Sequence, residues 1–445
     1  MDRLKEAQKL YNAGKFKEAE ALYRDIAING SREERGHASS ILFILYEDKI
    51  FPNGNEEEQE TFFTRGVELG SPLALFYVYM MDLDIQAKEY EVLVKELKKM
   101  ADDGCTTAMQ ELARMYEIGK YRKQDDRKAL QWYEKAAREG DVMAFFNVAL
   151  ILMDEKSKVK DLHKGYLYML KAASLGYSRA EYALGFCFLD GKGVAKDREK
   201  ALILFQKAAE HGENDACMKL WDLYSAGIPD ENGIPQRDLE KGFTWLKMAA
   251  ERGYKPAAMN MGMCYLNGYG TEIDGEKALY WYQKARDEGN TMAGAIIGTM
   301  YVNGVLGEGR EEEGISLLKE AAREGSLDAL RELGFLYLEG KGIHKDEKEG
   351  LRLLREAAYE GDSESYSRMG IYYLRKKDNE KALSCFRKAA ERGDASGEFH
   401  LAFFYIQGII VPKNIRKGIT LLQRAKEKGF YEAEKLMADI IKEDV

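Results

Sequence analysis

The stretch "ALGFCFLDGKGVAKDREKALILFQKAAEHG" at residues 183–212 decides the fold. Its first half places Gly185 and Phe188 three residues apart, and its second half places Ala201 and Ala208 seven residues apart. Residues seven apart lie on one face of an α-helix, so the second half presents small side chains to a close neighbour. A Gly-Lys-Gly corner separates the two halves. The stretch therefore predicts two helices joined by a tight turn.

The glycine that closes this stretch returns along the chain at a nearly fixed interval. It recurs as Gly140, Gly176, Gly212, Gly253, Gly289, Gly325, Gly361, Gly393 and Gly429. Successive glycines lie 36 residues apart, except for one step of 41 and one of 32. Such a period is typical of repeat proteins, in which each repeat packs only on its neighbours. Each glycine is expected at the left-handed position that ends a helix.

Each repeat also carries an alanine or glycine two helical turns before its closing small residue. These positions are Ala129, Gly165, Ala201, Gly242, Ala278, Gly314, Gly350, Ala382 and Gly418. Small residues alone at this position predict that the second helix approaches another helix closely. The large residues that follow it, Trp132, Trp245, Trp281 and Leu354, are expected to fill the space between repeats.

Together these motifs resemble the Sel-1-like repeat, a longer-looped relative of the tetratricopeptide repeat. The resemblance implies an all-α, right-handed α-solenoid of roughly twelve antiparallel helical hairpins. We expect one repeat array over 1–445, with a tetratricopeptide-like unit at 1–30 and divergent repeats at 31–104. Nine Sel-1-like repeats would follow at 105–429, and a C-terminal capping helix at 430–445.

One corner of the array imitates a chemical site. In "LEGKGIHKDEKEG" (338–350), a Gly-Lys-Gly turn could cradle a phosphate, and His344 could act in acid–base chemistry. However, "LDGKGVAKDREKA" (189–201) repeats the glycines and the acid without the histidine. A turn is needed in every repeat and a nucleotide site only once, so both stretches are interpreted as corners. The acids after such corners, at Asp197, Asp274 and Asp346, are expected to cap the next helix.

Composition and motif spacing argue against several other functions. The net charge is −9 with acids and bases interspersed, whereas nucleic-acid binders show concentrated basic stripes. The longest apolar run, 74–81, falls far short of the roughly 20 residues of a membrane span. The five histidines and five cysteines show no metal-ligand or nucleophile spacing. The N-terminus has no apolar signal-peptide core. These features predict a cytoplasmic protein with reduced thiols and with no catalytic residue, cofactor, metal or membrane insertion.

A binding surface is better supported. In relatives of this fold, the first helix of each repeat lines the concave wall. The residues six and ten positions after the closing glycines are unusually rich in aromatic residues and methionine, as interface cores are. The candidate groove residues are Phe76, Gln110, Arg114, Phe146, Tyr182, Phe186, Met218, Asp222, Met259, Met263, Arg331, Phe335 and Phe399. Alternatively, many of them pack against the first helix of the next repeat.

The function expected from the family resemblance is a non-catalytic scaffold, adaptor or regulator that binds a protein or peptide partner in the groove. One alternative is an immunity or inhibitor protein that wraps a toxin domain. Another is a hydrolase of the β-lactamase type, but the paired cysteines of such family members are missing. The inserted corner "AGIPDENGIPQRD" (226–238) is a second candidate binding site, or simply a tolerated insertion. The sequence leaves the partner and the oligomeric state open.

Overall fold

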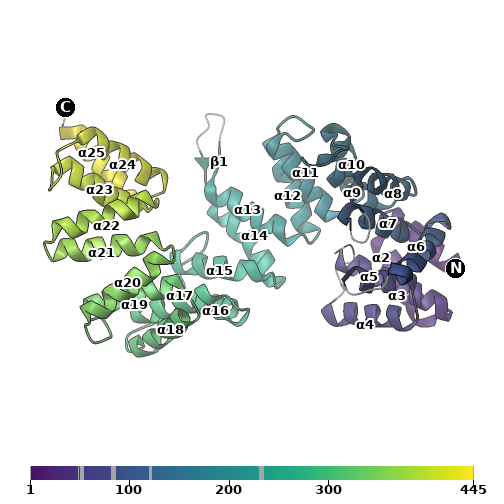
Figure 1. The fold of residues 1–445 in the computed structure, drawn as a ribbon, viewed down its shortest axis with the longest axis horizontal. Helices are drawn as coiled ribbons and strands as arrows, with labels where there is room; N and C mark the ends of the chain where they lie inside the picture. Colours follow the sequence, from purple (N-terminus) through teal and green to yellow (C-terminus); the bar gives the residue numbers. More distant parts are fainter. Residues whose placement is uncertain are drawn as a thin grey trace. The chain divides into compact units, whose positions relative to one another are not determined.

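The computed structural model describes residues 2–48, 50, 55–81, 87–119, 123–229 and 235–443. The chain divides into two compact units, Met1–Asp238 and Leu239–Val445, which we call the N-terminal unit and the C-terminal unit. Both consist of consecutive helical hairpins (Figure 1). The predicted fold class is confirmed: α1 to α12 form successive hairpins in the N-terminal unit, where α13 follows them, and in the C-terminal unit α15 to α24 form successive hairpins between α14 and α25.

The N-terminal unit begins with three hairpins that precede the regular repeats. Their helices are α1 (Asp2–Asn12), α2 (Phe16–Asn29), α3 (Arg32–Glu47), α4 (Glu56–Glu68), α5 (Pro72–Met81) and α6 (Ala87–Asp102). The regular repeats of this unit then contribute α7 (Thr106–Ile118), α8 (Asp126–Arg138), α9 (Val142–Met153), α10 (Leu162–Ser174), α11 (Ser178–Asp190), α12 (Arg198–Glu210) and α13 (Asn214–Ala226).

The inserted corner at 226–238 contains a short antiparallel pair of strands, β1 (Ile228–Pro229) and β2 (Pro235–Gln236). Residues 230–234 of this corner lie outside the described residues. A binding role for the corner therefore stays a prediction.

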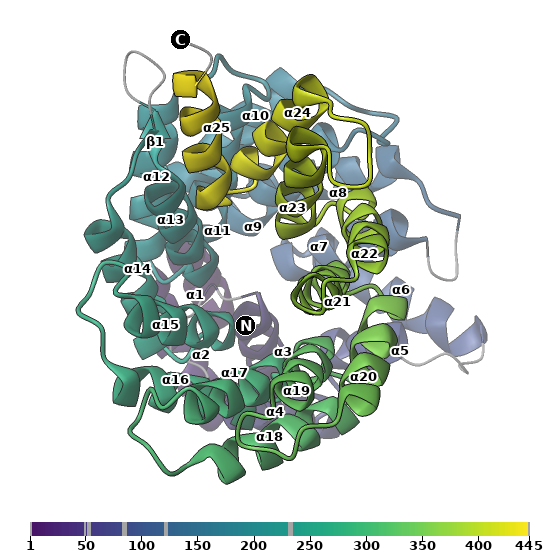
Figure 2. The ribbon, with the colours of Figure 1, turned by 90° about the vertical axis from the view of Figure 1, so that its left-hand side faces the viewer.

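The C-terminal unit continues the same alternation of helices. Its elements are α14 (Leu239–Glu251), α15 (Lys255–Asn267), α16 (Gly275–Asp287), α17 (Thr291–Val302), α18 (Glu311–Arg323), α19 (Leu327–Glu339), α20 (Glu347–Tyr359), α21 (Ser363–Arg375), α22 (Asn379–Glu391), α23 (Ala395–Gln407), α24 (Ile415–Glu427) and α25 (Tyr431–Glu443). Within this unit the helices follow an arc (Figure 2). The first helices of the repeats, α15, α17, α19, α21 and α23, line its inner side, and α16, α18, α20 and α22 lie outside them.

The corners have the geometry that the sequence predicts. Gly191 and Gly340 end α11 and α19 in the left-handed conformation, with φ of 77° and 73°. Asp197 and Asp346 then cap α12 and α20 by accepting hydrogen bonds from backbone amides of the first turn. Asp274 caps α16 in the same way. The Gly-Lys-Gly stretch around Lys341 is thus a turn with a helix cap, as expected.

The prediction of the residue that fills the space between helices is right for Leu354, which is fully buried, but in the three repeats with a tryptophan the filling residue lies one position later than expected. The tryptophans at the predicted position, Trp132, Trp245 and Trp281, are only half-buried. The next residue along the helix is buried in every repeat: Tyr133, Met169, Phe205, Leu246, Tyr282, Leu318, Leu354, Phe386 and Leu422. It packs on the glycine of the first helix: a Cβ on Gly185 would lie 2.5 Å from the Phe205 ring. That contact explains the glycine that α11, α15, α17, α19 and α21 carry at this point.

Candidate functional site

Two of the predicted groove residues are buried by the chain itself. Phe76 on α5 is fully buried and stacks on Tyr90, with ring centroids 6.1 Å apart. Gln110 on α7 donates a hydrogen bond to Asp141 Oδ1 (3.0 Å) and accepts one from Asn147 Nδ2 (2.9 Å). Both side chains hold neighbouring helices together and present no surface to a partner.

The other aromatic residues of the N-terminal unit are half-buried and pack in clusters. Tyr182 and Phe186 on α11 meet edge to face with centroids 5.0 Å apart, and both lie against Phe205 of α12. Phe146 on α9 packs edge-on against Tyr177, 5.2 Å away. Each ring therefore contributes to packing between helices while keeping part of its surface free.

The remaining predicted residues of the N-terminal unit are polar or flexible. Arg114 pairs with Glu111 at 2.5 Å and lies over the Tyr77 ring at 5.0 Å. Met218 is half-buried and Asp222 is exposed, both on α13. Burial raises the pKa of the Asp222 carboxyl, and nearby Lys219 opposes the shift. These three side chains share no common site.

The predicted residues of the C-terminal unit lie on the inner helices α15, α19 and α23. Met259 packs against the core between α15 and α17, and Met263 one turn further along is half-buried. Phe399 on α23 packs against Phe430, with centroids 5.2 Å apart. These residues therefore contribute in part to packing between repeats and keep in part a surface that faces solvent.

Arg331 on α19 is the most highly connected of the predicted residues. Its guanidinium pairs with Asp328 and with Asp362 Oδ1 (2.7 Å), and its Nε lies 3.6 Å from Glu364. Burial alone would lower the pKa of Arg331, but Glu364, Asp362 and Asp328 outweigh it and the pKa is raised. Arg331 is therefore a fixed cation that ties the beginning of α19 to the beginning of α21.

A second arginine extends this cluster over Phe335. The Arg368 guanidinium on α21 lies 5.0 Å from the centre of the Phe335 ring. It pairs with Glu332 at 3.2 Å and with Glu364 at 3.1 Å. Four carboxylates thus surround two guanidinium groups, which leaves the cluster with an excess of negative charge.

A hollow of about 300 Å³ lies beside this cluster, along α17. We call it the α17 hollow. Its lining residues are Leu266, Met292, Ala295, Ile296, Thr299, Met300, Asn303, Val305, Asp328, Arg331 and Glu332. The hollow exists because α17 has the small residues Ala295 and Thr299 at two positions of the repeat. At the same positions α15 carries Met259 and Met263, and α19 carries Arg331 and Phe335. Apolar side chains line its length, and acidic residues of α19 stand at one side.

The beginnings of α7, α9 and α11 in the N-terminal unit are covered by the hairpin of α1 and α2. Asn12 Nδ2 donates a hydrogen bond to the Glu139 carbonyl (2.6 Å), 127 residues further along the chain. A Cβ on Gly14 would lie 3.1 Å from the Leu175 carbonyl oxygen. Tyr11 is fully buried, and its pKa is raised well above the ordinary value by burial, Asp141 and Tyr177. The chain therefore closes this edge of its own N-terminal unit.

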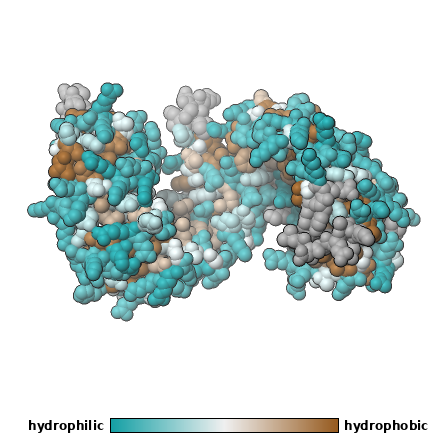
Figure 3. Space-filling view, viewed as in Figure 1, coloured by the Kyte–Doolittle hydropathy of each residue, from teal (hydrophilic) through white to brown (hydrophobic). Residues whose placement is uncertain are grey.

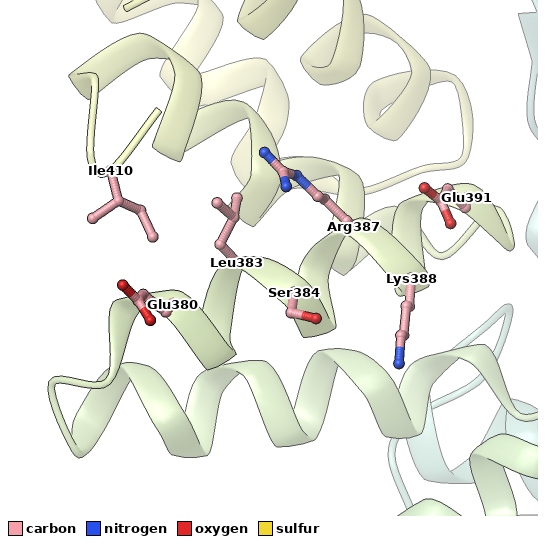
Figure 4. Close-up of a pocket in the computed structure, with 7 residues that line it drawn as sticks. All are labelled: Glu380, Leu383, Ser384, Arg387, Lys388, Glu391 and Ile410. Carbon is pink, nitrogen blue, oxygen red and sulfur yellow. The ribbon is translucent and has the colours of Figure 1, made fainter. Parts of the chain in front are cut away.

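A second hollow of the C-terminal unit, of about 430 Å³, lies along one face of α22 (Figure 4). Its lining residues are Glu380, Leu383, Ser384, Arg387, Lys388, Glu391 and Ile410. Ile410 takes the place that Gly193 and Gly270 hold in other corners, and like them it has a positive φ, here 51°. A Cβ on Gly270 would lie 2.0 Å from the Leu239 carbonyl oxygen, so a corner with isoleucine cannot approach its neighbour as closely.

Ile410 is also 53% exposed, and a β-branched residue in the left-handed region is strained.

Hydrophobic residues gather over the C-terminal helices α23 to α25 (Figure 3). The lining of the α22 hollow mixes two acids with two bases, so it specifies its occupant less than the α17 hollow does.

The histidines have structural neighbours. His211 Nδ1 lies 2.7 Å from the buried Glu181, which also pairs with Lys207 at 3.0 Å. The same arrangement returns one repeat before the C-terminus, where the buried Glu398 pairs with Arg424 and Lys428. His211 therefore belongs to a recurring ion pair that ties the second helix of a repeat to its first.

The cysteines offer little nucleophilic chemistry at neutral pH. All five thiols are free. Burial raises the pKa of Cys105 and of Cys187 to about 11, and that of Cys264 to about 12. Since the thiolate is the reactive form, these side chains stay protonated and inert. In the part of the chain that the structure describes, no three His, Cys, Asp or Glu residues cluster as metal ligands would.

The same described residues include no helix that is both long and apolar enough to cross a membrane.

Several residues of the α17 hollow were missed in the prediction from the sequence. Met292 and Val305 are exposed, and Asp328 and Glu332 form its acidic side. A signal was available: the stretch "TMAGAIIGTMYV" of α17 contains no charged residue, which is unusual in a chain that is 32% charged.

Comparisons with known proteins place the repeats in a family. Eight segments match the sequence model of the Sel1 repeat, and together they cover more than half of the chain. The segments are 106–141, 146–177, 178–213, 215–254, 255–290, 327–362, 363–394 and 395–430. The repeat formed by α17 and α18 lies between two matched segments. No curated protein shows a significant match to the sequence.

Solved structures include one of the same kind of fold and others that align less closely. The protective antigen c5321 of uropathogenic Escherichia coli, which displays an SLR fold, aligns with a TM-score of 0.55 and 22% identity over 95% of this chain and 82% of that one. A Sel1 repeat protein from Oxalobacter formigenes aligns with a TM-score of 0.47 and 24% identity over 78% of this chain and 91% of that one. The immunity protein Pa5087 from Pseudomonas aeruginosa has a TM-score of 0.26 and 20% identity, over 49% of this chain and 81% of that one.

Proposed function

Because the chain belongs to the Sel1 repeat family, we propose that it is a non-catalytic scaffold that holds a protein partner on the inner helices of its C-terminal unit. Sel1 repeat proteins are generally protein-interaction scaffolds. The observation that carries the proposal is the α17 hollow, where Met292 and Val305 are 48% and 42% exposed beside the Arg331 cluster. Exposed apolar side chains in a recess, next to arginine, are characteristic of interface cores.

The position of the hollow in the sequence supports the same proposal. The repeat of α17 and α18 is the one between residues 290 and 327 that the family pattern does not match. The repeats on both sides of it match the family pattern. The α17–α18 repeat therefore keeps the helical hairpin of the family but presents different side chains on its surface. A surface that departs from the repeat consensus at one place is what a specific binding site requires.

The partner is proposed to be a protein rather than a nucleic acid. The chain has a net charge of −9, and the cluster beside the hollow carries more carboxylates than guanidinium groups. A phosphate backbone would be repelled by such a surface. The free cysteines favour a reducing compartment such as the cytoplasm as the place of action.

The proposal is tested by photo-cross-linking from the inner and the outer surface. A photoreactive phenylalanine derivative replaces Thr299 in the α17 hollow or, as the control, Tyr280 on the outer helix α16, which is 60% exposed. The expected result is one protein cross-linked in stoichiometric amount from position 299 alone. The purified partner must then bind the purified chain, and Met292→Glu must weaken that binding about tenfold or more. Equal cross-linking from both positions, or none from either, would contradict the proposal.

A further inference from the structure

The two units contain equivalent helices that differ in what covers them. Met143 on α9 and Met292 on α17 each lie three residues after a closing glycine. Met143 is 7% exposed, whereas Met292 is 48% exposed. The residues just before them differ in the same way: Asp141 and Val142 are buried, and their counterparts before Met292 are exposed.

The cover over α9 is a helix of the same chain. Tyr11, near the C-terminal end of α1, lies beside the Met143 backbone and Asp141. Tyr23 of α2 is also fully buried near Asp141. In the N-terminal unit the beginning of a first helix therefore meets the end of an added helix, with a buried aromatic ring beside it.

Helices α9 and α17 resemble each other in composition. The stretches of α9, "VMAFFNVALILM", and α17, "TMAGAIIGTMYV", contain no charged residue. Helix α19, which flanks the hollow on the C-terminal side, carries four charged side chains: Asp328, Arg331, Glu332 and its last residue, Glu339. An uncharged helix surface that stays open to water is costly, so a partner that covers α17 gains free energy by removing that surface from water.

The charges around the α17 hollow restrict its occupant further. At the end where α19 begins, Asp328 and Glu332 line the hollow, and the excess negative charge of the Arg331 cluster lies behind them. At the opposite end Lys341 Nζ donates a hydrogen bond to Asn303 Oδ1 (2.8 Å). The two ends thus favour opposite charges, which gives a bound segment a direction along α17.

From these contacts we propose that the α17 hollow takes one amphipathic helix of a partner protein, which meets the beginning of α17 as the end of α1 meets the beginning of α9. The helix lays a large apolar or aromatic side chain against Met292 and Ile296, and it places a lysine or arginine beside Asp328. This inference rests on the proposed scaffold function and names the class of partner that this site accepts.

The test uses the full chain and a displayed library of helix-forming peptides of about 20 residues, long enough to hold a helix. The library varies the positions i, i+3, i+4 and i+7 that form one face of the peptide. Selection is expected to enrich an aromatic or leucine residue together with a lysine or arginine on that face. Thr299→Trp, which fills the hollow, should weaken the selected peptides about tenfold or more, and Tyr280→Trp on the outer surface should leave them unchanged.

A charge swap tests the direction of the helix. Lysine to glutamate in the selected peptide should abolish binding to the natural chain, and Asp328→Lys should restore it for the glutamate peptide. Hydrogen exchange of α19 checks that Asp328→Lys stays folded. A swap that fails to restore binding in the folded variant would overturn the assigned direction.

The other outcomes separate this inference from the proposed function. Selection of extended or acidic sequences, of helices that still bind Thr299→Trp, or of no peptide would overturn the helix assignment. Self-association of the chain that Thr299→Trp abolishes would also overturn it, since the occupant would then be a second copy. The scaffold function itself is decided by the cross-link from position 299, which requires a partner but not a helical one.

Discussion

The N-terminal and C-terminal units are built from the same repeat, yet they treat their inner helices differently. In the N-terminal unit the chain's own first hairpin covers the beginnings of α7, α9 and α11, and Tyr11 is fully buried there. In the C-terminal unit the beginning of α17 is exposed and a hollow runs along it. The difference teaches that a repeat surface is open to a partner only where the chain itself does not cover it, as at α17 and not at the beginning of α9.

Removal of the covering side chain should have the largest effect. Tyr11→Ala leaves a cavity under the N-terminal hairpin and should lower the local free energy of opening by about 3–5 kcal/mol, as for a fully buried aromatic residue. Native-state hydrogen exchange of the α9 amides measures this, because repeat proteins can open locally. Tyr280→Ala, at an exposed ring, should change the corresponding value for α16 by less than about 0.5 kcal/mol. Equal effects of the two substitutions would remove the distinction between covered and open helices.

The paired methionines sharpen the comparison at one repeat position. Met143→Ala should destabilise the N-terminal unit by about 2–5 kcal/mol, since a buried methionine loses its contacts. Met292→Ala should cost less than about 0.5 kcal/mol in the isolated chain, because nearly half of that side chain is in water. Urea denaturation monitored by exchange in each unit reports both values. The account fails if Met292→Ala is as destabilising as Met143→Ala.

Much of this organisation follows from the sequence, and the reason is its periodicity. The corners at Gly191 and Gly340, the caps at Asp197 and Asp346 and the succession of helical hairpins were all predicted correctly, because they depend on local backbone geometry that returns every repeat. Leu354 was identified correctly as a filling residue, but in three other repeats the conspicuous tryptophan was chosen instead of the buried residue that follows it, Tyr133, Leu246 or Tyr282.

The candidate site was less accessible to prediction. The line of residues six and ten positions after each glycine passes through the α17 hollow at Ala295, Thr299 and Arg331. Ala295 and Thr299 were not chosen as site residues, because small side chains carry no chemical group that suggests binding. Their small size is nevertheless what leaves space for the hollow. The burial of Met143 could not be foreseen either, since it lies beside Tyr11, more than one hundred residues earlier in the chain.

A smaller effect is expected at the strained corner of the C-terminal unit. Ile410→Gly removes a β-branched residue from φ = 51° and should stabilise this unit by about 1 kcal/mol. Backbone strain in this region costs about 1–3 kcal/mol. Part of the gain is lost because glycine gives the unfolded chain more conformational entropy. Gly270→Ile, the reverse change in the corner beside α14, should instead be strongly destabilising, since its side chain would overlap the Leu239 carbonyl. Thermal denaturation compares the two, and a loss of stability in Ile410→Gly would refute the strain.

The smallest expected effect is a pH dependence of the C-terminal unit. Burial lowers the pKa of His400, which stacks on Phe386 at 4.7 Å, while Asp394 and Glu432 partly oppose the shift. The unfolded chain therefore takes up a proton more readily than the folded one below the ordinary pKa of 6.5. The contribution of His400 to stability is fully present above that pH and is lost as the pH falls through the folded pKa. In His400→Phe this part of the pH dependence should disappear, and its persistence would assign it to other groups.

The measurement that tests the central claim most directly is oxidative footprinting of Met143 and Met292 in the same sample, since sulfoxide formation follows the exposure of the sulfur. In the free chain, Met292 should be oxidised much faster than Met143, because their exposed fractions are 48% and 7%. Addition of the partner identified from position 299 should slow the oxidation of Met292 and leave that of Met143 unchanged. Equal oxidation rates in the free chain, or protection of Met143 rather than Met292 by the partner, would contradict the account.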